Sequence, residues 1–166
     1  VDRDQVEVKH FQGWMEWAKE RNMKLDFNST SFSHPKSGNL TLSNPDKSIR
    51  DFWIEHTKRC RRIADAMGAY QGDPCIMNIW VHDGSKDYTV EKLRYRQILK
   101  ESLDEILAEN LPNMKPCLEA KLFGIGLEAY TVGSHDFYAG YCSKNNVIYT
   151  LDTGHYEPTE NVSAAV

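Results

Sequence analysis

The fold is decided by residues 74–123, PCIMNIWVHDGSKDYTVEKLRYRQILKESLDEILAENLPNMKPCLEAKLF. This stretch begins with a short apolar run at 75–81, passes through a polar loop into a segment with apolar residues at helical spacing at 92–110, and ends in a second apolar run at 117–123. Short apolar runs are typical of buried strands, and helical spacing over that length indicates a helix. The order strand, helix, strand predicts parallel strands in a βαβ unit.

The same alternation continues on both sides of this stretch. Strands are predicted at 24–32, 75–81, 117–123 and 147–151, and helices at 11–22, 45–67, 92–110 and, more weakly, 127–141. Ser43 or Asn44 is expected to cap the second helix and Gly68 to end it. Since a closed (β/α)8 barrel has eight strands, four strands leave two architectures open, a small open sheet or part of a barrel.

Composition indicates one soluble domain over residues 1–166. Hydrophobic residues make up 40% and charged residues 27%, with a net charge of -4. An acidic chain gives no reason to expect nucleic acid or an anionic membrane as partner, and no stretch reaches the roughly 18 apolar residues of a membrane helix. The basic run at 58–62 is expected to be a solvated helix face. Because the sequence starts at Val1 without a methionine and stops at Val166, we expect a piece of a longer chain.

The four cysteines do not suggest a metal or redox motif. They are Cys60, Cys75, Cys117 and Cys142, and none belongs to a CxxC pair. In a chain without an export signal, we expect them to be reduced core residues of a cytoplasmic protein.

Polar residues follow each predicted strand, which is where parallel α/β folds carry their sites. They cluster at the strand ends: Asn28, Thr30 and His34 at the first strand, Asn78, Trp80, His82 and Asp83 at the second, Glu119 and Lys121 at the third, and Asp152 and His155 at the fourth. We expect Glu119, Lys121, Asp152 and His155 to converge on one side of the sheet. His34 and His82 are more typical of surface histidines.

Glu119 and Lys121 are two residues apart, so on a strand both would point to one face, away from Leu118 and Ala120. A carboxylate and an ammonium inside an apolar strand are costly unless they are paired or bound to a metal. Two interpretations therefore stay open. One is a buried ion pair, and the other is a metal-binding carboxylate beside a lysine that polarises a carbonyl.

Asp152 and His155 lie at the end of a strand and in the turn after it. An oxygen ligand with an imidazole suits Mn, Zn or Co better than Ca. Alternatively, Asp152 only caps the turn and His155 is a partly buried polar residue. Trp80 has a similar pair of interpretations, since it is either a core residue or the wall of a sugar pocket.

A competing pattern lies at Gly124, Gly126 and Ala129, which fit the G-x-G-x-x-G/A fingerprint of dinucleotide-binding domains, with Asp152 about 20 residues later. Two features argue against it. The preceding strand carries Glu119 and Lys121, where a dinucleotide-binding strand is apolar, and the residues after Ala129 are a poor helix start.

Several motifs together resemble one family, the L-rhamnose isomerases. They are LDFN at 25–28, SFSHPKS at 31–37, TLS at 41–43, IRDFWI at 49–54, WVHDGSKD at 80–87, EAKLFGIG at 119–126, YTVGSH at 130–135 and LDTGHY at 151–156. Their order and their spread over about residues 14–160 make the resemblance far more specific than any single motif.

The resemblance implies a fold and an activity. The fold would be a (β/α)8 TIM barrel similar to xylose isomerase, of which this chain would supply about strands three to six. The activity would be the interconversion of L-rhamnose and L-rhamnulose, with two divalent metal sites, Mn most often and Zn or Co as alternatives. The complete enzyme would be a cytoplasmic homotetramer.

The resemblance also implies roles for individual residues. Glu119 and Asp152 match ligands of a structural metal, and His155 matches a ligand of the catalytic metal. Lys121 matches the catalytic lysine near the sugar carbonyl, and Trp80 the tryptophan of the sugar pocket. Glu157 departs from the pattern, because a histidine is expected there. The family's remaining ligands would lie beyond Val166, so the chain alone is expected to be inactive. A second hypothesis is a sugar-binding module of the same fold without catalysis.

Overall fold

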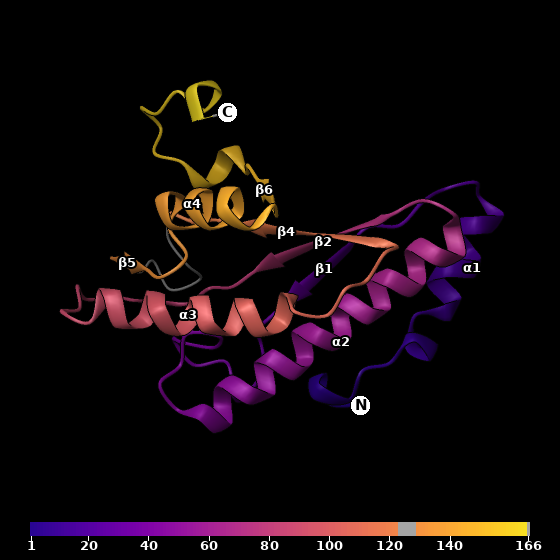
Figure 1. The fold of residues 1–166 in the computed structure, drawn as a ribbon, viewed down its shortest axis with the longest axis horizontal. Coiled ribbons are helices and arrows are strands. Elements are labelled where there is room, and N and C mark those ends of the chain that lie inside the picture. The colour runs from indigo at the N-terminus through magenta and orange to yellow at the C-terminus, as the bar shows by residue number, and fades with distance from the viewer. Residues whose placement is uncertain (123–128, 166) are drawn as a thin grey trace.

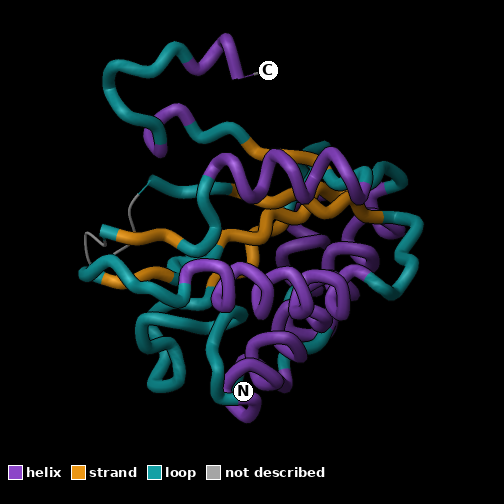
Figure 2. Tube along the Cα trace, turned by 60° about the vertical axis from the view of Figure 1, so that its left-hand side comes forward, coloured by secondary structure: helices purple, strands orange, loops and turns teal. Residues whose placement is uncertain are grey.

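The computed structural model describes residues 1–122 and 129–165, which form a parallel sheet with helices between its strands (Figures 1 and 2). The strands of the sheet are β1 (Phe27–Thr30), β2 (Cys75–Trp80), β4 (Met114–Glu119) and β6 (Ile148–Thr150). The helices between them are α2 (Lys47–Gln71), α3 (Lys92–Leu107) and α4 (His135–Asn145). The predicted parallel α/β organisation is therefore confirmed.

The strands lie in the order β1-β2-β4-β6, and every neighbouring pair is parallel. Each strand is thus added beside the one before it, in the same direction across the sheet. A doubly wound dinucleotide-binding sheet instead reverses its strand order at a switch point. Within the described residues, the strand order of the parallel sheet does not reverse.

Smaller elements surround this sheet. Helix α1 (Gln12–Glu20) packs against α2, and β3 (Gly84–Ser85) pairs antiparallel with β5 (Tyr130–Thr131). Single 3-10 turns are η1 (Arg3–Gln5), η2 (Val8–His10), η3 (Thr153–His155) and η4 (Val162–Ala165). In both views the segment after Tyr156 projects from the rest of the molecule (Figures 1 and 2). No helix among the described residues has the length and apolar character to cross a membrane.

The two faces of the sheet differ in polarity. Met77, Ile79 and Leu118 are fully buried in the core that the sheet shares with the helices. Side chains alternate along a strand, so the opposite face carries Asn78 and Glu119, both only half-buried. The expectation that Glu119 faces away from Leu118 is confirmed.

Helix α2 has different ends from those predicted. Asp46 caps it by accepting a hydrogen bond from the Ser48 amide at 2.8 Å, and it ends at Gly72, whose φ of 69° is left-handed. Gly68 therefore lies inside the helix. A Cβ on Gly68 would meet the Asn113 carbonyl oxygen at 1.8 Å, so the glycine serves the close approach of the loop before β4.

Three further predictions were wrong. The strand predicted at 117–123 is instead β4, which begins at Met114 and ends at Glu119. Pro116 is tolerated inside β4 because it lies where pairing with β6 has not yet begun. The weak helix predicted at 127–141 is helical only from His135 onwards, in α4, and is preceded by β5; residues 127 and 128 of that prediction lie outside the described residues. In the basic run, Arg61 is buried, because its guanidinium donates to the Ile106 and Glu109 carbonyls at the end of α3.

As predicted, all four cysteines are buried and free of disulfides. Burial raises the pKa of the Cys60 and Cys75 thiols to about 12. These groups are therefore neutral core side chains rather than thiolate ligands.

Candidate metal centre

Three side chains meet at the carboxyl ends of β4 and β6. Glu119 is the last residue of β4, and Asp152 and His155 belong to the turn that follows β6. One potential ligand atom from each lies within 4.8 Å of the other two. The convergence expected of these three residues is therefore confirmed.

The local structure of the turn explains how Asp152 reaches this cluster. Its Oδ1 accepts a hydrogen bond from the Gly154 amide at 2.8 Å, which caps the turn η3. Its Oδ2 lies 3.7 Å from His155 Nε2. The two alternatives for Asp152, turn cap and metal ligand, are thus compatible, because they use different oxygen atoms.

His155 is held in one ring orientation. Its Nδ1 lies 2.9 Å from the Ala120 carbonyl oxygen and 3.2 Å from Glu119 Oε1. A carbonyl oxygen only accepts, so Nδ1 carries the hydrogen and Nε2 offers its lone pair towards Asp152. Metal-binding histidines commonly donate their other ring N–H to a backbone carbonyl in this way.

Glu119 is oriented from inside the sheet by Asn78, whose amide donates to Oε2. The Thr150 hydroxyl donates to the Asn78 side-chain oxygen at 3.2 Å, which fixes the direction of the amide. Strand register places Asn78 beside Cys117 and Glu119 beside Thr150, all on one face. Sequence analysis had grouped Asn78 with the polar strand ends but had given it no role.

Lys121 and Trp80 lie next to the cluster. Since β4 ends at Glu119, Lys121 is beyond the strand, and the strand argument for its direction was wrong. It is 1% exposed, donates to the His82 carbonyl, and places its ammonium 5.8 Å from the centre of the Trp80 ring. The Trp80 ring also stacks on His155 at 6.4 Å. Trp80 therefore contacts both the lysine and the imidazole.

The loops around the second strand end hold two structural residues. His82 is buried, and its Nε2 lies 2.8 Å from the Gly38 carbonyl, so the surface prediction for it was wrong. Asp83 is fully buried and accepts hydrogen bonds from the Thr41 and Ser43 hydroxyls and from the Ser43 amide. These bonds fasten the loop after β1 to the end of β2. Sequence analysis gave Asp83 no structural role, because its partners are about 40 residues away.

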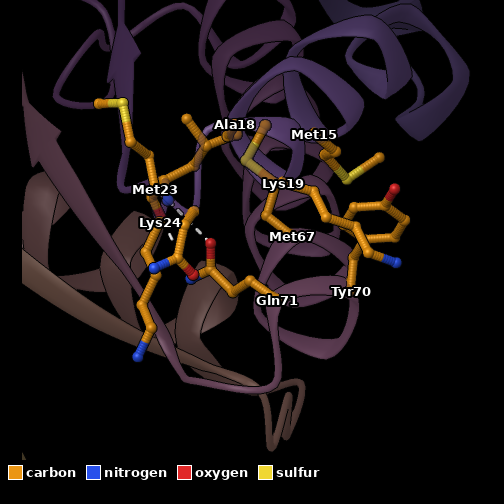
Figure 3. A pocket seen from close by; sticks show the side chains of 10 residues that line it. Met15, Ala18, Lys19, Met23, Lys24, Met67, Tyr70 and Gln71 are labelled. Carbon is orange, nitrogen blue, oxygen red and sulfur yellow. Dashed lines mark hydrogen bonds between the residues drawn. The ribbon is translucent and has the colours of Figure 1, made fainter.

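Two further candidates for a binding site are a glycine pattern in the sequence and a hollow between two helices. The dinucleotide-type glycines, Gly124 and Gly126, lie outside the described residues. A hollow of about 160 Å³ between α1 and α2 is lined by apolar and uncharged polar side chains and two lysines (Figure 3). Since no carboxylate or imidazole is among its described lining residues, this hollow is not a metal site.

The donor set fits a divalent transition metal. Two carboxylates and one imidazole suit Mn, Zn or Co, and their separation allows one ion to contact all three. About three-quarters or more of the Glu119 and His155 side chains is shielded from solvent, whereas Asp152 is 45% exposed. Three ligands are fewer than the usual four of a closed site, which leaves positions open for other groups.

A consecutively ordered parallel sheet with such a cluster at its carboxyl edge defines an α/β protein with a candidate divalent-metal centre. The family model described as L-rhamnose isomerase (RhaA) matches residues 1–166, and the chain belongs to this family.

Curated relatives agree with the family model. The chain is 68% identical over 166 residues to an L-rhamnose isomerase of Bacteroides thetaiotaomicron, which covers 100% of the chain and 40% of that relative. It is 52% identical over 165 residues to the L-rhamnose isomerase of Mannheimia succiniciproducens, covering 98% of the chain and 40% of the relative. For the L-rhamnose isomerase of Rhodopirellula baltica the identity is 49% over 166 residues, with 98% and 39% covered. The chain thus spans about 40% of the length of these relatives.

Proposed function

We propose that this chain forms part of a metal-dependent L-rhamnose isomerase that interconverts L-rhamnose and L-rhamnulose. The observation that carries the proposal is the convergence of Glu119, Asp152 and His155 at the carboxyl edge of a parallel sheet. Membership of the family supports it independently of that geometry. Mn is the proposed metal, with Zn or Co as alternatives, because the donor set is mixed oxygen and nitrogen.

The proposed architecture of the whole enzyme is a xylose isomerase-like (β/α)8 barrel. In it, β1, β2, β4 and β6 would be about strands three to six, and residues 1–166 would belong to a single domain. The consecutive strand order supports this arrangement. So does the half-buried polar face with Asn78 and Glu119, which would line the barrel interior.

In this proposal each residue has a distinct task. Glu119 and Asp152 hold the structural ion, and His155 Nε2 is directed to the catalytic ion. The bound ions supply charge stabilisation to the sugar oxygens during transfer of hydrogen between C1 and C2. The Lys121 ammonium stabilises negative charge developing on the C1 oxygen. The Trp80 ring packs against the apolar face of the sugar and keeps water from the reacting carbons.

Family resemblance alone supports the remaining parts of the proposal, a cytoplasmic homotetramer without nucleic-acid or membrane partners. Since three ligands are too few for two sites of about four ligands each, residues 1–166 alone are expected to be inactive and to bind metal weakly.

The test uses a full-length protein of this family that contains residues 1–166. The protein is stripped of metal with a chelator, reconstituted with Mn²⁺ and assayed for conversion of L-rhamnose. We expect turnover only after metal is restored, and none from residues 1–166 alone. Full turnover in the stripped protein would contradict metal dependence. Binding of L-rhamnose by the metal-loaded protein without conversion would favour the non-catalytic sugar-binding module.

A further inference from the structure

His135, the first residue of α4, contacts the turn that carries two of the three potential ligands. Its Nε2 lies 2.6 Å from the His155 carbonyl oxygen, and its Nδ1 lies 2.7 Å from the Tyr149 hydroxyl. Its ring stacks on Tyr156, with centroids 3.9 Å apart and an interplanar angle of 30°. One imidazole therefore joins α4, β6 and the residues on either side of the turn.

The directions of the two hydrogen bonds follow from the partners. The His155 carbonyl only accepts, so Nε2–H donates to it, and Nδ1 accepts the hydrogen of the Tyr149 hydroxyl. Burial raises the pKa of the Tyr149 phenol, so this hydroxyl keeps its hydrogen and remains a donor. Both nitrogens of the His135 imidazole are thus hydrogen-bonded, and one ring face stacks on Tyr156.

Three residues at the start of the turn, Asp152, Thr153 and Gly154, are exposed, and the residues after Tyr156 are mostly exposed as well. Within the turn, the His155 amide donates to the Asp152 carbonyl at 3.0 Å, which closes the turn but does not attach it to the body. Attachment to the body comes from several contacts: His155 Nδ1 reaches the Ala120 carbonyl and Glu119, Trp80 stacks on His155, and His135 donates to the His155 carbonyl.

We propose that His135 is a positioning residue of the metal centre: it holds the backbone of His155 so that His155 Nε2 and Asp152 Oδ2 are directed to the metal centre. The proposal rests on the proposed function, because it gives His135 a task only if a metal binds there. His135 contacts no ligand atom itself. Groups that orient metal ligands in this indirect way typically change metal affinity by about 10–100-fold when removed.

The test measures Mn²⁺ affinity by calorimetry on the stripped full-length protein. His135→Ala is expected to weaken binding by about 10–100-fold. His135→Gln, whose amide can still donate to the His155 carbonyl, is expected to restore part of the loss. His34→Ala is the matched control, since His34 also stacks on a ring, Phe52 at 4.9 Å, and also makes two hydrogen bonds, to Asp2 and from the Lys36 amide. Its affinity should equal that of the wild type.

A second pair of variants separates loss of the Tyr149 hydroxyl contact from general destabilisation of the fold. Tyr149→Phe removes the donor to His135, whereas Tyr141→Phe removes another hydroxyl, which donates to Asp104 at 2.9 Å from α4, the helix that carries His135. We expect a smaller loss of affinity than in His135→Ala for the first and none for the second. Wild-type affinity in His135→Ala, or an equal loss in His34→Ala, would overturn the proposal and leave the isomerase assignment intact. No Mn²⁺ binding by the wild type would overturn both.

Discussion

The carboxylates at the two ends of the parallel sheet have different partners. At the amino ends of the strands, the Asp26 carboxylate accepts a hydrogen bond from the Ile76 amide at 2.8 Å, and Asp65 accepts one from the Asn113 amide at 2.7 Å. Asp73 pairs with Lys24 at 2.8 Å. At the carboxyl ends, Glu119 and Asp152 instead direct oxygen atoms towards one imidazole, that of His155.

This difference separates residues that complete the fold from residues that we propose bind a metal ion. The carboxylates at the amino end are stabilised by backbone N–H bonds or by an ammonium, whereas Asp152 accepts such a bond at Oδ1, from the Gly154 amide, and turns Oδ2 towards His155 Nε2. Two carboxylates with ligand atoms within 4.8 Å of each other repel, and a cation between them removes that repulsion. The carboxylates at the amino end are therefore paired within the protein alone, whereas the proposed metal ion would complete the carboxyl end.

The largest expected effect belongs to the carboxyl end. In the full-length enzyme, Lys121→Met should lower turnover by about 10²–10³-fold, because it removes the ammonium assigned to the sugar C1 oxygen. Metal content, measured by elemental analysis of the purified variant, should stay at the wild-type level. Near-normal turnover would mean that Lys121 serves only the fold.

At the amino end, a substitution should change stability and leave metal affinity alone. Gly68→Ala places a Cβ 1.8 Å from the Asn113 carbonyl oxygen and should destabilise the protein by about 2–3 kcal/mol. Gly140→Ala is the matched control, because a Cβ there meets nothing within 4 Å in helix α4, and it should be neutral or stabilising by up to about 1 kcal/mol. Thermal unfolding of the two variants measures the contrast. Equal stability would show that the loop before β4 moves away easily.

The smallest expected effect is a pH dependence of the free energy of unfolding that arises from His56 in α2. Burial lowers the pKa of His56, the Arg3 guanidinium and His34 add to this, and hydrogen bonds to the Arg3 and Thr30 carbonyls oppose it. A lowered folded-state pKa means that the unfolded chain binds the proton more tightly. The contribution of neutral His56 to stability is therefore fully present at a pH above its unfolded-state pKa of about 6.5, and stability falls as the pH drops below that value.

The predicted slope from His56 is at most about 1.4 kcal/mol per pH unit. His56→Gln keeps a hydrogen-bonding side chain without a titrating ring, so its stability should fall less between pH 7 and pH 5.5. Denaturant unfolding at both pH values measures the difference. An identical pH dependence in the variant and the wild type would show that His56 is not the group responsible.

The sequence predicted the parts of this molecule that depend on local pattern. Apolar runs such as 75–81 and the helical spacing at 92–110 placed the strands and helices of the sheet correctly, and strand ends pointed to Glu119, Asp152 and His155. The errors arose where distant residues decide the structure. The local sequence predicts that Gly68 ends the helix, but Gly68 lies inside α2, where it contacts Asn113, 45 positions away.

The supporting residues of the site were missed for the same reason. Asn78 orients Glu119 from the neighbouring strand, and His135 reaches the His155 carbonyl from α4, 20 positions earlier in the chain. Neither has a local signal, because an asparagine on a strand or a histidine at a helix start has many ordinary roles. Only the register of the strands and the path of the turn after β6 bring them to the cluster.

The most direct test of the central claim is Mn²⁺ binding by the stripped full-length protein with single carboxylates neutralised at each end of the sheet. Glu119→Gln and Asp152→Asn should each weaken binding at least about 10-fold, because each removes a charged ligand, while Asp73→Asn at the amino end should bind as the wild type does. Wild-type affinity in both Glu119→Gln and Asp152→Asn would contradict the account, since the cluster at the carboxyl ends of β4 and β6 would then not be a metal centre.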